Sequence, residues 1–269
     1  YSKYVDGTYV IDLYLSSVGR QLDVFGGANN AGYGAKVFPA PYGGQGLNNP
    51  MDLVIPQSEV YLYGYLTYNC YPEQSKEVSF EIIDNHGNTW GKFVAITNST
   101  GIASIVFRMP WVCDNPEYYI GEWTVVATAN LADVVVTDTM TFHYDYMVHI
   151  WKVTTDQYYY KHGDYIQVTV NYGSHAMQNY PALFTVTVTD ELGVPIGINA
   201  TFSTLVGGVA PADYCTYNNG TFTVTIYIPK FAFTGCAYIH VGAFDKEPAE
   251  GGFAWCPEYS AQEIYILPE

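Results

Sequence analysis

The chain has 269 residues, which is enough for two domains of ordinary size. Hydrophobic residues make up 49% of it and charged residues only 13%, so a core can form while few long charged side chains remain to build helix surfaces. Ten Lys and Arg against 26 Asp and Glu give a formal net charge of −16, which argues against nucleic acid and anionic membrane surfaces as partners. No apolar run reaches the ~18 residues of a membrane helix, so we expect no membrane span.

The first predicted strand is Thr8–Leu15, close to the N-terminus. A two-residue period puts its apolar side chains on one face, namely Tyr9, Ile11, Leu13 and Leu15. A second short strand is expected at Gln21–Phe25, before a loop rich in Gly, Asn and Pro at Gly26–Pro50. The strand at Thr8–Leu15 is either an ordinary first strand of a domain or a strand that completes the sheet of a neighbouring subunit.

Two later segments repeat one pattern, which fixes the domain organisation. Each contains an Asp-x-x-Gly turn, a Gly turn that leads into a strand ending at proline, and then an alternating strand. The first copy comprises Asp84–Gly87, Thr97–Pro110 and Gly121–Asn130, and the second comprises Asp190–Gly193, Thr216–Pro229 and Gly235–Asp245.

Short alternating strands separated by turns predict an all-β chain of two tandem β-sandwiches. No stretch has a convincing helical period. We expect an N-terminal extension at 1–25, a first domain at 26–146 and a second domain at 147–269, with almost no linker between the two domains.

The motifs of the first copy resemble those of a known family. The strand Val78–Ile83, the Thr97–Ala103 turn and the Gly-x-Trp-x-Val-x-Ala segment at Gly121–Ala127 resemble the Ig-like repeats of bacterial invasin-type and archaeal surface proteins. The likeness covers Asp52–Tyr146 and is weaker over Met147–Glu269. It implies two Ig-like sandwiches that act outside the cell as spacers, adhesins or assembly units. An additional N-terminal strand is similar to the organisation of archaeal and bacterial filaments built by donor-strand exchange.

Export is also indicated by processing and glycosylation signals. The chain begins at Tyr1 without a methionine, as a processed N-terminus does. Three sequons predict N-linked glycans at Asn98, Asn199 and Asn219, two of them in the repeated Gly turns. We therefore expect an extracellular or cell-surface glycoprotein.

Five cysteines allow disulfides in that compartment. Cys70 and Cys113 are the two candidates inside the first domain, although strand counting puts them at opposite ends of it. Cys215 and Cys256 fall at the same end of the second domain, and Cys236 is left over.

The sequence contains no HExxH, GxSxG or Walker motif, so we do not expect an enzyme. Ser174 and His175 are neighbours along the chain, which rarely makes a nucleophile–base pair. His143, Asp145 and His149 could form a metal site, but a domain-boundary strand with mixed polar residues is the favoured interpretation, and no metal is assigned.

Two acidic clusters could bind calcium, although solvated loops are the favoured interpretation and no cofactor is assigned. They consist of Asp114, Glu117 and Glu122, and of Asp245, Glu247 and Glu250.

The leading prediction is a structural subunit of an extracellular filament, pilus-like, or of a surface layer. It would polymerise with copies of itself by giving Thr8–Leu15 to a neighbour. The alternative is an adhesin or carbohydrate-binding module, because the tyrosines of Gln157–Lys161 could stack on sugars as well as form a subunit contact.

Overall fold

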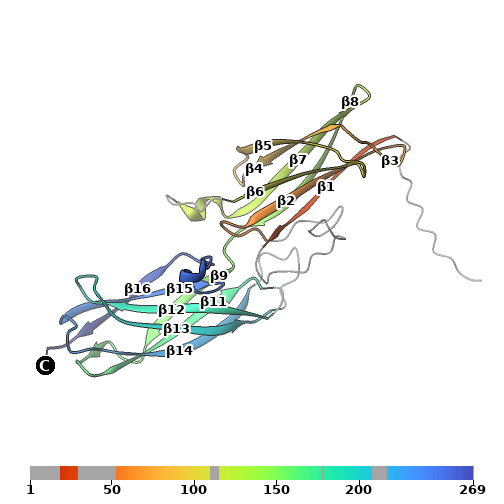
Figure 1. The fold of residues 1–269 in the computed structure, drawn as a ribbon. Coiled ribbons are helices and arrows are strands. Elements are labelled where there is room, and N and C mark those ends of the chain that lie inside the picture. The colour runs from red at the N-terminus through yellow and green to blue at the C-terminus, as the bar shows by residue number, and fades with distance from the viewer. Residues whose placement is uncertain (1–18, 30–52, 110–114, 177–178, 208–216, 269) are drawn as a thin grey trace, which may run out of the picture.

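The computed structural model describes residues 19–29, 53–109, 115–176, 179–207 and 217–268. Within those ranges the elements are β-strands, apart from two short 3-10 helices, η1 (Pro116–Tyr119) and η2 (Pro248–Glu250). The strands form two sandwiches in tandem (Figure 1). The predicted all-β sandwich fold is therefore confirmed. No helix in the described part of the chain is long and apolar enough to cross a membrane.

The first domain contains a sheet of β1, β2, β3 and β6 and a sheet of β5, β4, β7 and β8. In the first sheet, β2 lies between β1 and β6 and also pairs with the short β3 at its end. The bounds are β1 (Arg20–Asn29), β2 (Glu59–Tyr68), β3 (Tyr71–Pro72), β4 (Glu77–Ile83), β5 (Thr89–Ile96), β6 (Ile102–Arg108), β7 (Gly121–Leu131) and β8 (Val134–Tyr144). Alternate residues point inward and surround Trp123, which is 1% exposed.

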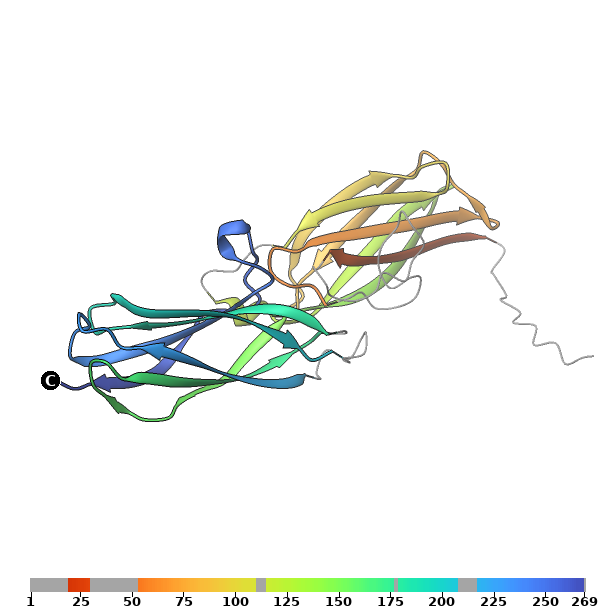
Figure 2. The ribbon, with the colours of Figure 1, turned by 60° about the horizontal axis from the view of Figure 1, so that its bottom comes forward.

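The second domain repeats this order. One sheet has β11 between β14 and β9, and the other runs β10-β16-β15-β12-β13. The bounds are β9 (Val148–Thr155), β10 (Tyr159–Tyr160), β11 (Tyr165–Ser174), β12 (Tyr180–Thr189), β13 (Pro195–Leu205), β14 (Asn218–Tyr227), β15 (Gly235–Phe244) and β16 (Tyr259–Ile266). Figure 2 shows the strands of each domain stacked in two layers. Both domains have the Greek-key order of an immunoglobulin-like sandwich.

The predicted Asp-x-x-Gly turns are confirmed as equivalent structures in the two domains. Asp84 Oδ1 accepts the backbone N–H groups of His86 and Asn88 between β4 and β5. Asp190 Oδ1 accepts those of Leu192 and Val194 between β12 and β13. In each turn the glycine has a positive φ, 82° at Gly87 and 75° at Gly193, which glycine adopts without steric cost.

The Gly turn is not repeated, which corrects the sequence interpretation. Gly101 does form a turn between β5 and β6, with φ of 77°. Gly220 instead lies within β14 and pairs with Tyr172 of β11. A Cβ atom at Gly220 would meet the buried Tyr172 ring at 2.3 Å, so this glycine makes room for an aromatic side chain instead of bending the chain.

The predicted domain boundary at residue 25 falls inside β1. That strand pairs with β2 over its whole length, from Arg20 opposite Tyr68 to Asn29 opposite Glu59. Leu22 and Val24 point into the core of the first domain, at 7% and 2% exposure. The described part of the predicted extension is therefore the edge strand of domain 1.

A buried apolar cluster joins the two domains. Leu53 and Ile55, which precede β2, belong to one cluster with Met147, Val148 and Trp255 of domain 2. Val54 lies beside the end of β8, where its N–H donates to His143 O at 2.8 Å and its carbonyl accepts from Asp145 N at 3.1 Å. A short joint held by packing and backbone hydrogen bonds therefore connects the sandwiches near residue 146.

Candidate functional site

The seam between the first and last strands is closed in domain 1. Here β1 faces β8, and three hydrogen bonds cross from one to the other or to the turn beside it. Val24 N donates to Asp138 Oδ2 at 2.7 Å, and Arg20 donates to Leu131 O at 2.6 Å and to Ala132 O at 3.2 Å. Burial and the neighbouring Asp138 carboxylate raise the pKa of Asp23 in this seam.

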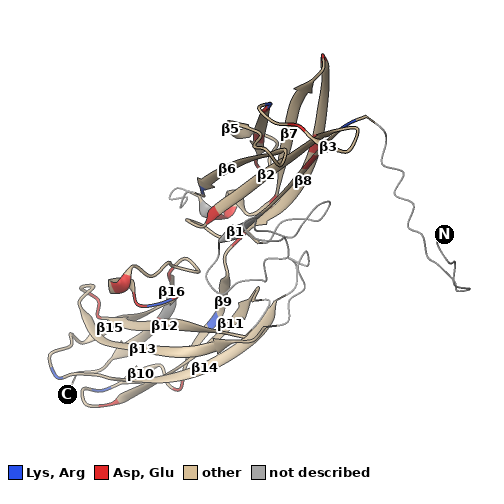
Figure 3. Cartoon of the chain, turned by 45° about the vertical axis from the view of Figure 1, so that its right-hand side comes forward, with Lys and Arg blue, Asp and Glu red and all other residues tan. Residues whose placement is uncertain are grey.

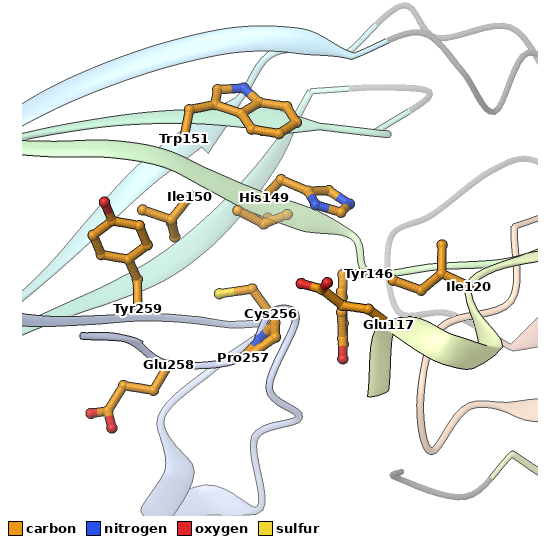
Figure 4. Close-up of a pocket in the computed structure, with 11 residues that line it drawn as sticks. Glu117, Ile120, Tyr146, His149, Ile150, Trp151, Cys256, Pro257, Glu258 and Tyr259 are labelled. Carbon is orange, nitrogen blue, oxygen red and sulfur yellow. The ribbon is translucent and has the colours of Figure 1, made fainter. Parts of the chain in front are cut away.

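The equivalent seam of domain 2, between β9 and β16, contains a cavity of about 540 Å³ (Figure 4). Among the described residues, β16 pairs on this side only at Tyr265 and Ile266, with the short β10. The other described residues of β16 have no strand partner on this side. The cavity is lined by Glu117 and Ile120 of domain 1 and by Tyr146, Val148, His149, Ile150, Trp151, Cys256, Pro257, Glu258 and Tyr259.

The cavity offers a mixed apolar and hydrogen-bonding surface. Ile150 and Tyr259 are half-buried, and Trp151 is 48% exposed. The Trp151 ring stacks on His149 with centroids 5.3 Å apart, and its N–H donates to Asn219 Oδ1 at 3.1 Å. Burial raises the pKa of Cys256 to about 12, so this thiol is not a nucleophile near neutral pH.

Next to the cavity, histidines gather around the buried carboxylate of Asp145, which is 3% exposed. His149 Nε2 lies 3.1 Å from Asp145 Oδ1. His175 and His143 approach Asp145 Oδ2 through their Nε2 atoms at 3.3 and 3.6 Å. Tyr217 O–H lies 3.4 Å from the same oxygen. The sequence placed His143, Asp145 and His149 together, and the structure adds His175 and Tyr217.

Two opposing effects act on the Asp145 carboxyl. Burial alone would raise its pKa, because a charge is costly in a dry interior. Hydrogen bonds from His143, His149 and His175 outweigh that effect and hold the pKa well below its usual range. The Tyr146 backbone N–H also donates to Asp145 Oδ1, at 2.6 Å. Asp145 is therefore an anion at neutral pH, and the histidine nitrogens surround it.

His175 and Tyr217 were not identifiable as members of this cluster from sequence spacing. His175 stands 30 residues after Asp145 and Tyr217 stands 72 residues after it. They reach the joint because β11 ends there and β14 begins there, and the two antiparallel strands pair along their whole length. Ser174, the sequence neighbour of His175, donates to Val206 O at 3.5 Å, and no nucleophile–base pair forms between the two.

Other predicted sites have mixed outcomes. The donor-face residues Tyr9, Ile11, Leu13 and Leu15 lie outside the described residues, as do Cys113 and Cys215. Cys70 is exposed and Cys256 is buried. Because Cys113 and Cys215 lie outside the described residues, the suggested disulfide pairings stay predictions.

The sequon side chains differ in their access to solvent. Asn98 and Asn219 are exposed, but Asn199 is half-buried and its Nδ2 donates to Thr225 O at 3.3 Å. Acidic residues are spread over both domains (Figure 3). Within the described residues neither acidic cluster brings three ligand atoms together, and Asp114 lies outside them.

Comparisons with known proteins add little about function. No protein-family model and no curated protein matches the chain. Solved structures that resemble it include the alpha-2-macroglobulin of E. coli, at 11% identity, a TM-score of 0.36 and coverage of 82% of this chain and 16% of the other. Salmonella alpha-2-macroglobulin is 10% identical, with a TM-score of 0.36 and coverage of 81% and 16%. Red sea bream transglutaminase is 8% identical, with a TM-score of 0.32 and coverage of 93% and 31%. The chain therefore spans less than a third of the length of each of these proteins.

Proposed function

We propose that the chain is a structural subunit of an extracellular filament or surface layer. In this proposal the predicted strand Thr8–Leu15 of one copy completes a sheet of its neighbour by lying in the open seam of domain 2. The invasin-type resemblance of the repeat motifs and the three sequons support an extracellular location. The observation that carries the proposal is the cavity between β9 and β16, at the place where the matching seam of domain 1 is closed.

The direction of the chain agrees with head-to-tail assembly. Arg20 contacts Leu131 at the tip of the β7–β8 hairpin, whereas Tyr144 at the other end of β8 adjoins the joint with domain 2. Gly19 therefore lies at the end of domain 1 that is remote from domain 2. The 18 residues before it can span roughly 60 Å when extended, enough to follow a strand of an adjoining copy.

Strand addition supplies the two contributions that such an assembly needs. The part of the β16 edge before its pairing with β10 provides backbone donors and acceptors, and the apolar face of Tyr9, Ile11, Leu13 and Leu15 would fill the space beside Ile150 and Tyr259. The same contact is repeated from copy to copy without closing on itself, which produces an open polymer.

Opposite faces of the donor strand provide a matched test. Ile11→Asp with Leu13→Asp places two charges on the apolar face, and Thr8→Asp with Tyr14→Asp places two charges on the other face. We expect the first pair to leave folded monomers and the second to polymerise like the unmodified chain. Sedimentation velocity and negative-stain microscopy measure the outcome. Deletion of Tyr1–Leu15 should also leave folded monomers.

Two outcomes would contradict the proposal. One is an unmodified chain that stays monomeric at every concentration tested. The other is normal polymers from the Ile11→Asp, Leu13→Asp variant. The Ile150→Glu variant tests where the donated strand binds, because it places a charge in the proposed acceptor seam. Alone, this variant should not polymerise. It should still add to the ends of filaments of the unmodified chain, because its own donor strand is intact.

A second candidate function, sugar binding by an adhesin, is favoured by one observation. Tyr158 and Tyr159 are 43% and 58% exposed and meet edge to face with ring centroids 4.8 Å apart, whereas Tyr160 is buried. Exposed rings can stack on sugar faces. A glycan-array signal that disappears in a Tyr158→Ala, Tyr159→Ala variant would support this function, and an unchanged signal would exclude these rings as the site.

A further inference from the structure

Three metal-binding side chains meet at the joint between the domains. Asp145 lies between β8 and β9, His149 is in β9, and His175 follows β11. One ligand atom from each lies within 4.8 Å of the other two. His149 lines the seam cavity, but Asp145 and His175 do not, so the cluster that they form needs an account separate from the strand addition.

The spacing of these atoms also allows them to share one ion in place of direct hydrogen bonds. The Nε2 atoms of His149 and His175 lie 3.1 and 3.3 Å from the two Asp145 oxygens. An ordinary N–H···O hydrogen bond is about 2.9 Å long. Ligands around a tetrahedral zinc ion, with bonds of about 2.0–2.1 Å, stand about 3.3 Å apart. The two distances end on different oxygens of one carboxylate, and together with the 4.8 Å limit on the set they put both imidazole nitrogens and the carboxylate within reach of a single ion.

His175 provides a second, independent observation. Its ring is 0% exposed, and its Nδ1 has no hydrogen-bond partner among the described residues. A buried imidazole whose one polar contact is 3.3 Å long gains little from that contact, and burying it is costly. A metal bond through Nε2 would replace that long contact with a strong interaction, and Nδ1 would take no part in it.

We propose that Asp145, His149 and His175 bind one zinc ion, which ties the end of domain 1 to domain 2. Two imidazole nitrogens and one carboxylate favour zinc over calcium or magnesium, which prefer oxygen ligands. Three protein ligands leave a fourth position for water. The inference is independent of the proposed function.

The surroundings orient the ligands. The Tyr146 N–H donates to Asp145 Oδ1, and Tyr217 O–H lies 3.4 Å from Oδ2, so both carboxylate oxygens are held in place. The Tyr217 ring also packs against His175, with centroids 4.0 Å apart. His149 lines the seam cavity, which gives an ion a path from solvent (Figure 4).

The test uses the full chain after dialysis against EDTA. Titration with zinc chloride, followed by removal of excess metal and elemental analysis, should give one zinc per chain, whereas calcium chloride should leave no calcium bound. Zinc at about 100-fold above its Kd should raise Tm by roughly 5 °C. Zinc should also slow proteolytic cleavage at the joint.

Substitutions identify the ligands. His149→Gln, at a side chain that is 20% exposed, should weaken zinc binding more than roughly tenfold and abolish the Tm shift. His86→Gln in domain 1 serves as the matched control and should bind zinc normally. His175→Gln is buried and can fail to fold, so the proposal is judged on the unmodified chain and on His149→Gln. Absence of stoichiometric zinc from the unmodified chain, or equal zinc binding by His149→Gln, would overturn it.

Discussion

The two sandwiches have the same strand order and differ at the seam between their first and last strands. In domain 1, β1 is held against β8 and the neighbouring turn by Arg20 and by the Val24 N–H, and its apolar side chains enter the core. In domain 2, a cavity lies between the start of β9 and the start of β16, at the joint. The same fold therefore links its two sheets by side-chain hydrogen bonds and packing at this seam in one copy and has a cavity at the joint end of the seam in the other.

The difference shows what a first strand contributes to this fold. β1 adds backbone pairing along all of β2 and buries Leu22, Val24 and Phe25. β9 pairs with β11, but its exposed Trp151 and half-buried Ile150 face the seam. Closure of a seam depends on the side chains that cross it, because both first strands already have their backbone partner on the other side.

The largest expected effect comes from opening the closed seam. Deletion of residues 1–29 removes three buried side chains worth about 2 kcal/mol each, as well as the β1–β2 pairing. The loss approaches the whole stability of an ordinary domain. We expect domain 1 to unfold at a much lower temperature while domain 2 keeps its own transition, with the two followed by calorimetry.

Deletion of only Tyr1–Leu15 is the matched control, since it leaves β1 in place. Its calorimetric profile should equal that of the monomeric unmodified chain. Equal profiles for both deletions would mean that β1 contributes nothing to domain 1, contrary to its burial.

Next in size is the pair of glycines that the sequence pattern treated as equivalent. Gly101→Ala should destabilise domain 1 by about 2 kcal/mol, because φ is 77° and the new Cβ would meet Leu66 O at 2.7 Å. Gly220→Ala should cost domain 2 about 2 kcal/mol for a different reason, overlap with the Tyr172 ring. Urea unfolding measures both losses.

A third glycine separates backbone strain from overlap. Gly87 has φ of 82°, but nothing lies within 4 Å of its absent Cβ. Gly87→Ala should therefore cost only about 1 kcal/mol. A Gly220→Ala variant that is no less stable than the unmodified chain would show that the Tyr172 ring moves aside freely.

The sequence predicted those features that depend on local chemistry. Alternation identified most of the strands, and the Asp84 and Asp190 turns were recognised because carboxylates capping backbone N–H groups have a short-range signature. Gly220 was misread because Gly serves both turns and close packing, and only the position of Tyr172 distinguishes them. His175 joined Asp145 through strand pairing between distant segments, which spacing along the chain does not encode. The cavity could not be predicted either, because its walls come from segments that are distant along the chain.

The smallest expected effect is a pH dependence of the closed seam. The pKa of Asp23 is raised by burial and by Asp138, so folding favours its protonated form. The carboxyl therefore supports folding below its unfolded pKa, near 4, and this contribution is lost as the pH rises through the higher folded value. Asp23→Asn removes the buried charge. It should stabilise domain 1 by about 0.5 kcal/mol at pH 7 and change nothing at pH 3.

Urea midpoints at the two pH values measure the difference, and Asp133→Asn, on the exposed turn between β7 and β8, is the matched control. A stabilisation that is equal at both pH values would assign the effect to the amide itself. That result would mean that repulsion between the Asp23 and Asp138 carboxylates does not destabilise the seam, which packing and hydrogen bonds would then close alone.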